Sequence, residues 1–123
     1  MHEVSVTLQF SAAHNLRGYR GQCEALHGHN WKVEVSLAAR TLDKLGMVAD
    51  FKVIKGHLKA ILAPLDHAYL NNLADFKKIN PTSEHIARLV FEGMRKRISA
   101  GGLKVSKVRV WETDNSCATY SQP

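Results

Sequence analysis

Apolar and polar residues alternate along two long segments in the first third of the chain. Within residues 2–10 every second side chain is apolar from Val4 to Phe10, and within residues 27–39 the same holds from Trp31 to Leu37. A period of two is typical of a strand with one buried face. The pattern therefore predicts two long strands, which can pair as an antiparallel hairpin.

A loop is predicted between these strands, at residues 11–26, where Gly18 and Gly21 interrupt the alternation. Loops of this length inside compact domains are usually functional. The loop and the strand ends beside it are therefore where reactive side chains matter most.

Two later segments have the helical period instead. Asp50 suits an N-cap and Pro64 ends the first helix, whose apolar face is formed by Phe51, Ile54, Leu58, Ile61 and Leu62. A second helix is expected to begin at Asn80-Pro81 and to stop at Gly101-Gly102, because proline suits the first helical position and glycine follows helix ends. Its apolar stripe consists of Ile86, Val90, Met94 and Ile98.

The C-terminal part of the chain returns to strand patterns, at residues 103–112 and 116–121. The whole predicts an α+β fold for residues 1–123 as a single domain: a four-stranded antiparallel sheet with two helices packed on one face. Such a sheet leaves two edges open, and small domains often close their edges by forming oligomers.

The net charge of +6 suits an anionic partner such as nucleic acid, a membrane surface or a phosphorylated small molecule. The basic residues are scattered, without the interleaved aromatic residues typical of single-strand binders. No apolar run approaches the roughly 20 residues of a membrane span, and the N-terminus does not read as a signal peptide. A cytoplasmic protein with free thiols at Cys23 and Cys117 is therefore expected, rather than a disulfide.

Three histidines are the first candidates for chemistry. His27 and His29 share the parity of the buried row that Trp31 continues, and His14 follows the first strand. Imidazoles beside a buried row are costly to leave without partners. A single His-x-His pair is weak support, since many are surface or core residues, but three neutral histidines match a catalytic zinc with one open position.

Cys23 lies four residues before His27, close enough to approach that open position. A metal nearby would favour its thiolate, and a thiolate beside a zinc ion suggests proton abstraction from a bound substrate. The alternative is a small buried apolar residue.

Asp66-His67 and Glu112 are further candidates. An aspartate can orient an imidazole that shuttles protons, although adjacent residues are expected to reach different partners rather than each other. Glu112 ends the row of Val108 and Val110. It is either a solvated strand end or an acid that recognises an amide-like edge by two hydrogen bonds.

Five motifs lie in order along nearly the whole chain: Phe10-Ser-Ala-Ala-His14, Cys23-x-x-x-His27-Gly-His29-Asn30, Leu65-Asp66-His67-x-x-Leu70-Asn71, Asn80-Pro81-Thr82-Ser83-Glu84 and Trp111-Glu112-Thr113. Together they resemble the 6-pyruvoyl-tetrahydropterin synthase and 6-carboxytetrahydropterin synthase family. The resemblance implies the tunnelling fold, in which three subunits close their sheets into a barrel and two trimers stack into a hexamer. It also implies active sites between subunits.

The resemblance implies that the three histidines hold Zn²⁺ and that Cys23 is the general base. Asp66 and His67 of a neighbouring subunit would complete the proton relay. Glu112 would anchor the amino-pyrimidinone edge of the pterin, and Thr82 and Ser83 would also touch it. The substrate would be 7,8-dihydroneopterin triphosphate, whose charge matches a basic protein.

The spacing of Cys23 and His27 resembles the bacterial 6-carboxytetrahydropterin synthases of queuosine biosynthesis, which release acetaldehyde and triphosphate. Glu24 leaves a second possibility open, because some relatives use a glutamate there to make 6-hydroxymethyl-7,8-dihydropterin for folate. A 6-pyruvoyl-tetrahydropterin synthase activity is a further alternative. From other classes, a basic nucleic-acid-binding module and a pterin-binding protein without catalysis are the competing hypotheses.

Overall fold

The computed structural model describes residues 1–21, 24–98 and 102–123. Their elements, in chain order, are β1 (His2–His14), β2 (His27–Ala39), α1 (Phe51–Leu62), β3 (Ala68–Tyr69), the 3₁₀ turns η1 (Leu70–Asn72) and η2 (Ala74–Phe76), α2 (Ser83–Arg97), β4 (Lys104–Thr113) and β5 (Ser116–Tyr120). Neither α1 nor α2, the α-helices of these ranges, is long and apolar enough to cross a membrane.

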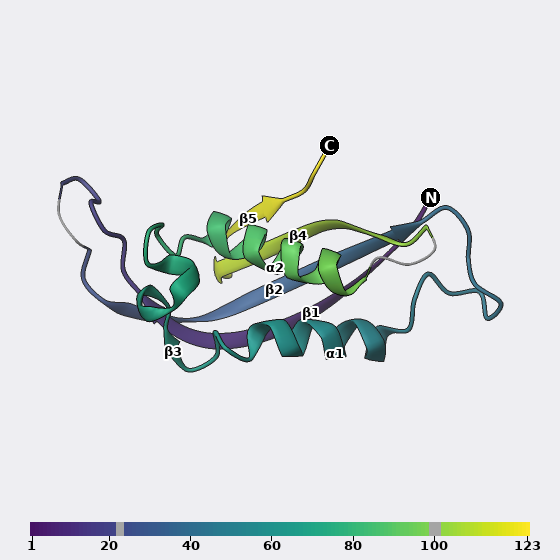
Figure 1. The fold of residues 1–123 in the computed structure, drawn as a ribbon, viewed down its shortest axis with the longest axis horizontal. Coiled ribbons are helices and arrows are strands. Elements are labelled where there is room, and N and C mark those ends of the chain that lie inside the picture. The colour runs from purple at the N-terminus through teal and green to yellow at the C-terminus, as the bar shows by residue number, and fades with distance from the viewer. Residues whose placement is uncertain (22–23, 99–101) are drawn as a thin grey trace.

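The strands form one sheet in the order β3-β1-β2-β4-β5 (Figure 1). The predicted sheet was correct in its four long strands but lacked β3, which pairs in parallel with Ala12 and Ala13 of β1. A strand of two residues has no periodicity, so its pairing is decided by tertiary contacts alone.

The register of β1 and β2 places the predicted rows opposite each other. Phe10 pairs with Trp31, and His14 pairs with His27 at the end of the hairpin. β1 continues to His14, so residues 11–14 belong to the strand and not to the predicted loop.

A β-bulge between Ser36 and Leu37 shifts the pairing of β2 with β4. Because of this shift, Val105 and Val108 are both buried although their separation is odd. Beyond the bulge the parity is regular, and Val108 and Val110 are fully buried. The buried row of β4 therefore leads directly to Glu112.

The helices lie together on one face of the sheet, as predicted (Figure 1). Asp50 caps α1 by accepting a hydrogen bond from the Lys52 N–H at 2.8 Å. A Cβ atom at Gly93 of α2 would lie only 3.1 Å from Cδ1 of Ile61, so the glycine permits the two helices to pack closely.

The predicted start of α2 at Asn80-Pro81 was too early. The hydroxyl of Thr82 accepts a hydrogen bond from the His85 N–H at 3.1 Å, so Thr82 is the N-cap and Ser83 the first helical residue. Pro81 precedes the cap, where its missing N–H also costs nothing.

The core lies between the helices and the sheet. Trp31, Val33, Val35 and Leu37 of β2 are fully buried there, against apolar residues of both helices. The opposite face of the sheet carries polar contacts, including Ser5 with Ser36 at 2.7 Å and Lys32 over the Trp111 ring at 4.2 Å.

Candidate metal centre and active site

The ends of three strands bring four side chains together on the core face of the sheet. His14 ends β1, His27 and His29 begin β2, and Glu112 lies near the end of β4. One ligand atom from each lies within 4.8 Å of the others. The sequence predicted the three histidines as a metal site, and the structure adds Glu112 to this group.

The four side chains face a common centre. The Nε2 atoms of His14 and His27 are 2.9 Å apart. Oε1 of Glu112 lies 2.8 Å from Nε2 of His29, 3.1 Å from that of His14 and 3.6 Å from that of His27. Imidazole nitrogen and carboxylate oxygen are both good ligands for zinc.

The hydrogen bonds of the Nδ1 atoms determine whether the Nε2 atoms, which face the centre, have a lone pair for a metal ion. Nδ1 of His14 donates to the Pro81 carbonyl at 2.8 Å, and Nδ1 of His27 donates to the Ala25 carbonyl at 2.9 Å. A neutral imidazole that donates through Nδ1 has a lone pair on Nε2. Two such lone pairs 2.9 Å apart repel each other, and a cation between them removes the repulsion.

His29 supports the same conclusion. Its Nε2 is buried and makes no hydrogen bond within the described part of the chain, although Glu112 lies 2.8 Å away, outside hydrogen-bond geometry. Burial lowers the pKa of the His29 imidazole, more than the Glu112 carboxylate raises it. A neutral ring whose buried Nε2 makes no hydrogen bond has the state that a metal ligand requires, so the donor set fits a divalent metal ion.

Trp31 closes the back of the centre. It is fully buried, stacks on Phe10, and donates from Nε1 to the Ala12 carbonyl at 3.2 Å. Its ring packs edge-on against His14 and His29, with centroids 4.8 and 5.4 Å away. This wall holds two imidazoles in place and keeps water from reaching the centre through the core.

Two predicted residues, Cys23 and Glu24, are neighbours in the sequence just before His27. Cys23, the predicted general base, lies outside the described residues. Glu24 is half-buried: Oε1 accepts a hydrogen bond from the Leu16 N–H at 3.3 Å and lies 3.7 Å from Nδ1 of His27. Glu24 thus faces the outer nitrogen of His27 and not the centre.

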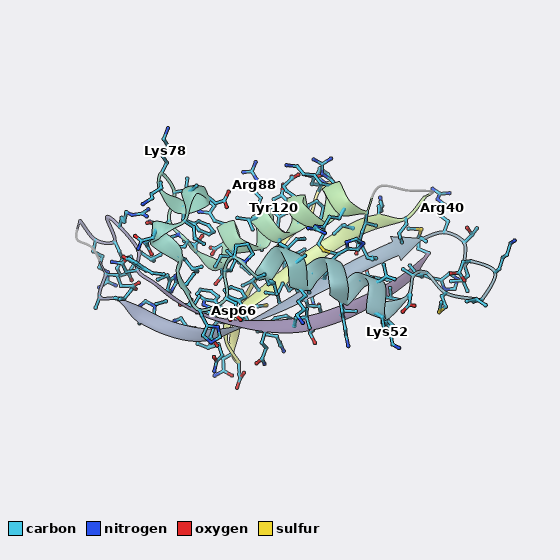
Figure 2. The ribbon with its side chains drawn as sticks, turned by 60° about the horizontal axis from the view of Figure 1, so that its bottom comes forward. Arg40, Lys52, Asp66, Lys78, Arg88 and Tyr120 are labelled. Carbon is cyan, nitrogen blue, oxygen red and sulfur yellow. The ribbon has the colours of Figure 1, made fainter. Side chains whose placement is uncertain are left out.

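Asp66 and His67 do not belong to the four-residue cluster of their own chain. Asp66 lies beside β1, where its carboxylate accepts a hydrogen bond from the Ser11 N–H at 3.0 Å (Figure 2). That bond is the main cause of the lowered pKa of Asp66. His67 points outward, with 82% of its side chain exposed.

The expectation that Asp66 and His67 reach only different partners was wrong. Nδ1 of His67 lies 3.0 Å from Oδ1 of Asp66. The contact is possible because His67 adopts a left-handed backbone with φ of 58°, and its N–H donates to the Ser11 carbonyl at 2.6 Å. This conformation costs about 1–2 kcal/mol in a residue other than glycine and often marks functional positions.

Thr82 and Ser83 lie at the start of α2, directly after Pro81, whose carbonyl holds His14. The Thr82 hydroxyl already accepts the helix-capping hydrogen bond. Both side chains are half-buried. Their position beside the centre is compatible with substrate contact, while Thr82 also has a structural role.

Sequence reasoning assigned no role to two asparagines. Asn71 and Asn80 bond to the backbone of the loop between β1 and β2. Both lie in motifs that the sequence displays, so their positions were visible although their contacts were not.

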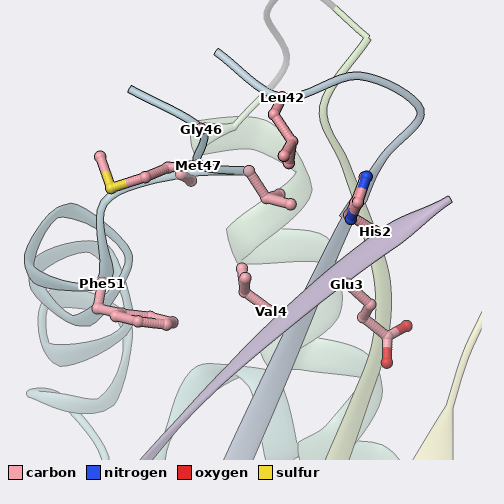
Figure 3. A pocket seen from close by; sticks show the side chains of 9 residues that line it. His2, Glu3, Val4, Leu42, Gly46, Met47 and Phe51 are labelled. Atoms are coloured by element: carbon pink, nitrogen blue, oxygen red, sulfur yellow. The ribbon is translucent and has the colours of Figure 1, made fainter. Parts of the chain in front are cut away.

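A separate hollow of about 330 Å³ lies between the start of β1 and the segment before α1 (Figure 3). Val4, Leu42 and Phe51 line it, and no member of the metal cluster does. His2 and His14 are the two ends of β1, about 40 Å apart at the usual rise per residue. This hollow is therefore not part of the metal centre.

Comparison with known proteins identifies the family. The family model described as 6-pyruvoyl tetrahydropterin synthase matches residues 3–123. The 6-carboxy-5,6,7,8-tetrahydropterin synthase of Synechocystis sp. is 39% identical over 119 residues, covering 93% of this chain and 88% of that protein. The protein of the same name from Haemophilus influenzae is 31% identical over 144 residues, covering 99% of this chain and 100% of its own length.

A solved structure agrees with the sequence comparisons. The 6-pyruvoyl tetrahydropterin synthase of Caenorhabditis elegans superposes with a TM-score of 0.85 at 26% identity, covering 99% of this chain and 96% of that one. The fold is thus the tunnelling fold of these synthases. The chain belongs to the 6-pyruvoyl tetrahydropterin synthase family.

Proposed function

We propose that this protein is a zinc-dependent 6-carboxy-5,6,7,8-tetrahydropterin synthase. It converts 7,8-dihydroneopterin triphosphate to 6-carboxytetrahydropterin, acetaldehyde and triphosphate, as a step of queuosine biosynthesis. The observation that carries the proposal is the convergence of three imidazoles and one carboxylate at the ends of three neighbouring strands. The named relatives at 31–39% identity support the choice of reaction.

In this proposal His14, His27 and His29 hold the metal. When bound, the ion supplies Lewis-acid stabilisation of negative charge on substrate oxygens. The carbonyls of Pro81 and Ala25 fix the tautomers of two ligands, and the Trp31 wall keeps their rings oriented.

Cys23 is the proposed general base, which takes a proton from the substrate side chain. Asp66 and His67 move protons on the opposite side, in a site completed by a neighbouring subunit. The Asp66 carboxylate is charged at neutral pH, and its pKa is lowered further by the Ser11 N–H, so it can accept a hydrogen bond from Nδ1–H of His67. Nε2 of His67 is then directed to the outside of its own chain, where a neighbour's substrate could meet it.

Glu112 has two candidate partners. Its carboxylate is 33% exposed, so it can recognise the amino-pyrimidinone edge by two hydrogen bonds. Its approach to the three histidines also suits a fourth metal ligand. Glu112→Gln distinguishes the two roles: a raised KM with full metal content supports recognition, whereas loss of metal from the variant supports ligation.

The central experiment is a product assay. Purified protein is incubated with 7,8-dihydroneopterin triphosphate, and the products are identified by mass. We expect 6-carboxytetrahydropterin and acetaldehyde, loss of turnover after chelation, and recovery with zinc. Cys23→Ala should abolish turnover while the metal remains bound, and Cys117→Ala is the matched control because Cys117 is exposed on β5. Full turnover by Cys23→Ala would refute the general-base assignment.

A second candidate is formation of 6-hydroxymethyl-7,8-dihydropterin with Glu24 as the base. It is favoured by the half-buried carboxylate of Glu24 beside His27. The same assay separates the two by the mass of the pterin, and a 6-pyruvoyl product would indicate the third activity. If the hydroxymethyl product forms, Glu24→Gln should abolish it and Cys23→Ala should not.

A further inference from the structure

The loop between β1 and β2 is held by hydrogen bonds more than by apolar packing. Two of its apolar side chains, Tyr19 and Leu26, are 49% and 59% exposed. Its turn contains Gly18 and Gly21 at positive φ, joined by a hydrogen bond of 3.1 Å from the Gly21 N–H to the Gly18 carbonyl. In the described part of this loop, polar contacts are therefore the main interactions that fix its position relative to the metal centre.

Two asparagine side chains supply such contacts, each by the same geometry. Asn71 Oδ1 accepts from the Asn15 N–H at 3.0 Å, while its Nδ2 donates to the Asn15 carbonyl at 2.8 Å. Asn80 Oδ1 accepts from the Arg17 N–H at 2.8 Å, while its Nδ2 donates to the Arg17 carbonyl at 3.0 Å. Each amide thus imitates a neighbouring strand and satisfies both backbone groups of one loop residue.

Arg17 ties the same parts together from the other side. Its guanidinium donates to the carbonyls of Phe76 at 2.6 Å, Asn71 at 3.1 Å and Ile79 at 3.2 Å. The segment that carries both asparagines is therefore fixed to the loop in both directions. We call Asn71, Asn80 and Arg17 the loop clasp.

The clasp leads directly to the acidic side chain beside the metal ligands. Nδ2 of Asn15 donates to the Glu24 carbonyl at 3.0 Å, and the Glu24 N–H donates to the Leu16 carbonyl at 2.9 Å. Leu16 in turn donates to the Glu24 carboxylate at 3.3 Å. The asparagines of the clasp hold the backbone groups of Asn15 and Arg17, which flank Leu16, so the position of Glu24 depends on the clasp.

We propose that Asn71 and Asn80 are positioning residues, which set the loop segment that bears Glu24 against His27 of the metal centre. The proposal deepens the proposed function and rests on it for the role of Cys23. It differs from a role in metal binding, because neither asparagine belongs to the metal cluster. A misplacement of the loop by about 1 Å should lower the rate strongly, since general-base catalysis depends on geometry.

The test uses full-length protein loaded with zinc, in a Cys117→Ser background so that Cys23 is the only thiol. The variants are Asn71→Ala, Asn80→Ala and the double variant. Asn72→Ala is the matched control, because Asn72 is the exposed neighbour of buried Asn71. The readouts are zinc content, kcat and KM on 7,8-dihydroneopterin triphosphate, thermal unfolding, and the pH profile of Cys23 alkylation by iodoacetamide.

We expect each single variant to keep its zinc and to lose about tenfold or more in kcat with little change in KM. The double variant should lose less than the product of the single losses, because both asparagines hold one loop. The alkylation profile of Cys23 should shift toward that of an ordinary thiol, near pH 8.5. Asn72→Ala should behave as the background protein.

Unchanged kcat and alkylation in folded Asn71→Ala and Asn80→Ala would overturn the proposal, as would an equal loss in Asn72→Ala. If Asn71→Ala does not fold, the half-buried Asn80→Ala decides. Failure of both to fold would also overturn it, in favour of a role in stability alone. The alkylation profile needs no substrate, so it still judges the clasp if the proposed reaction itself proves wrong.

Discussion

The histidines of the metal cluster are prepared for their role by contacts outside the cluster. The outer hydrogen bonds of His14 and His27 to backbone carbonyls leave the inner nitrogens as acceptors. Burial lowers the pKa of His29 and leaves it neutral without any such bond. The three rings are therefore prepared for metal binding in two ways, two by hydrogen bonds to backbone carbonyls and one by burial.

Substitution of Trp31 tests how much this buried side chain behind the metal centre contributes to the stability of the fold. Trp31→Ala removes a fully buried indole and should cost about 3–5 kcal/mol of unfolding free energy. Trp31→Phe should cost less, because a ring would still pack against His14. Denaturant unfolding at fixed protein concentration measures both. Trp111→Ala, at a half-buried position, is the control; an equal loss there would contradict the argument.

Asp66 makes the stability depend on pH. The Ser11 N–H and His67 lower the folded-state pKa of Asp66, so its charged form stabilises the fold. This contribution is complete above the ordinary aspartate pKa of about 3.9 and is lost as pH falls through the lower folded value. Asp66→Asn should thus unfold at lower temperature than the parent at pH 6, and the gap should close in acid. A gap that does not change with pH would refute the assignment.

Among the elements, α2 shows how local chemistry and the site share residues. Its N-cap, Thr82, follows the carbonyl that holds His14. The cap fixes where the helix begins and thereby where Pro81 lies. The start of α2 and the orientation of His14 therefore depend on the same short segment.

Removing the cap gives a prediction for this element. Thr82→Ala should lower the unfolding free energy by about 1 kcal/mol, and Thr82→Ser should retain most of it, because serine also accepts from the His85 N–H. Chemical denaturation of the two variants checks this. If Thr82→Ala is as stable as the parent but loses substrate affinity, the hydroxyl serves the substrate and not the helix.

The elements also show what periodicity can predict. The cap at Asp50 and the buried rows of β1 and β2 were predicted correctly, because each follows from neighbours in sequence. The turn of η1 and the strand β3 were not predicted, because two or three residues are too few to show a repeating pattern. The start of α2 was misplaced by two residues, since proline is favourable both before and after a cap.

For the whole molecule, the open sheet is the dominant feature. β3 and β5 are its two edge strands (Figure 1). The face away from the helices carries polar contacts, such as Ser5 with Ser36 and Lys32 over Trp111. Edges of this kind invite pairing with further copies. We propose closed trimers, two of which stack into a hexamer, with each active site shared between subunits.

Mixing two inactive variants tests the shared site. Co-expressed His27→Ala and His67→Ala chains, carrying different tags and purified through both, should regain activity although each alone is inactive. Equal random mixing would restore about a quarter of the sites, since each site needs one intact chain for each residue. No recovery in verified mixed oligomers would place both residues of a site in one chain.

The sequence by itself determined the buried face of β2 and the apolar stripe of α2, because period and side-chain type are local properties. From these it determined that His14, His27 and His29 end adjacent buried rows. Only the tertiary structure decided which distant groups complete the centre: Pro81 lies 67 residues from His14, and Glu112 lies 98 residues from it. Those contacts, like the two asparagine bonds to the loop, depend on how separate elements pack, and packing leaves no period in the sequence.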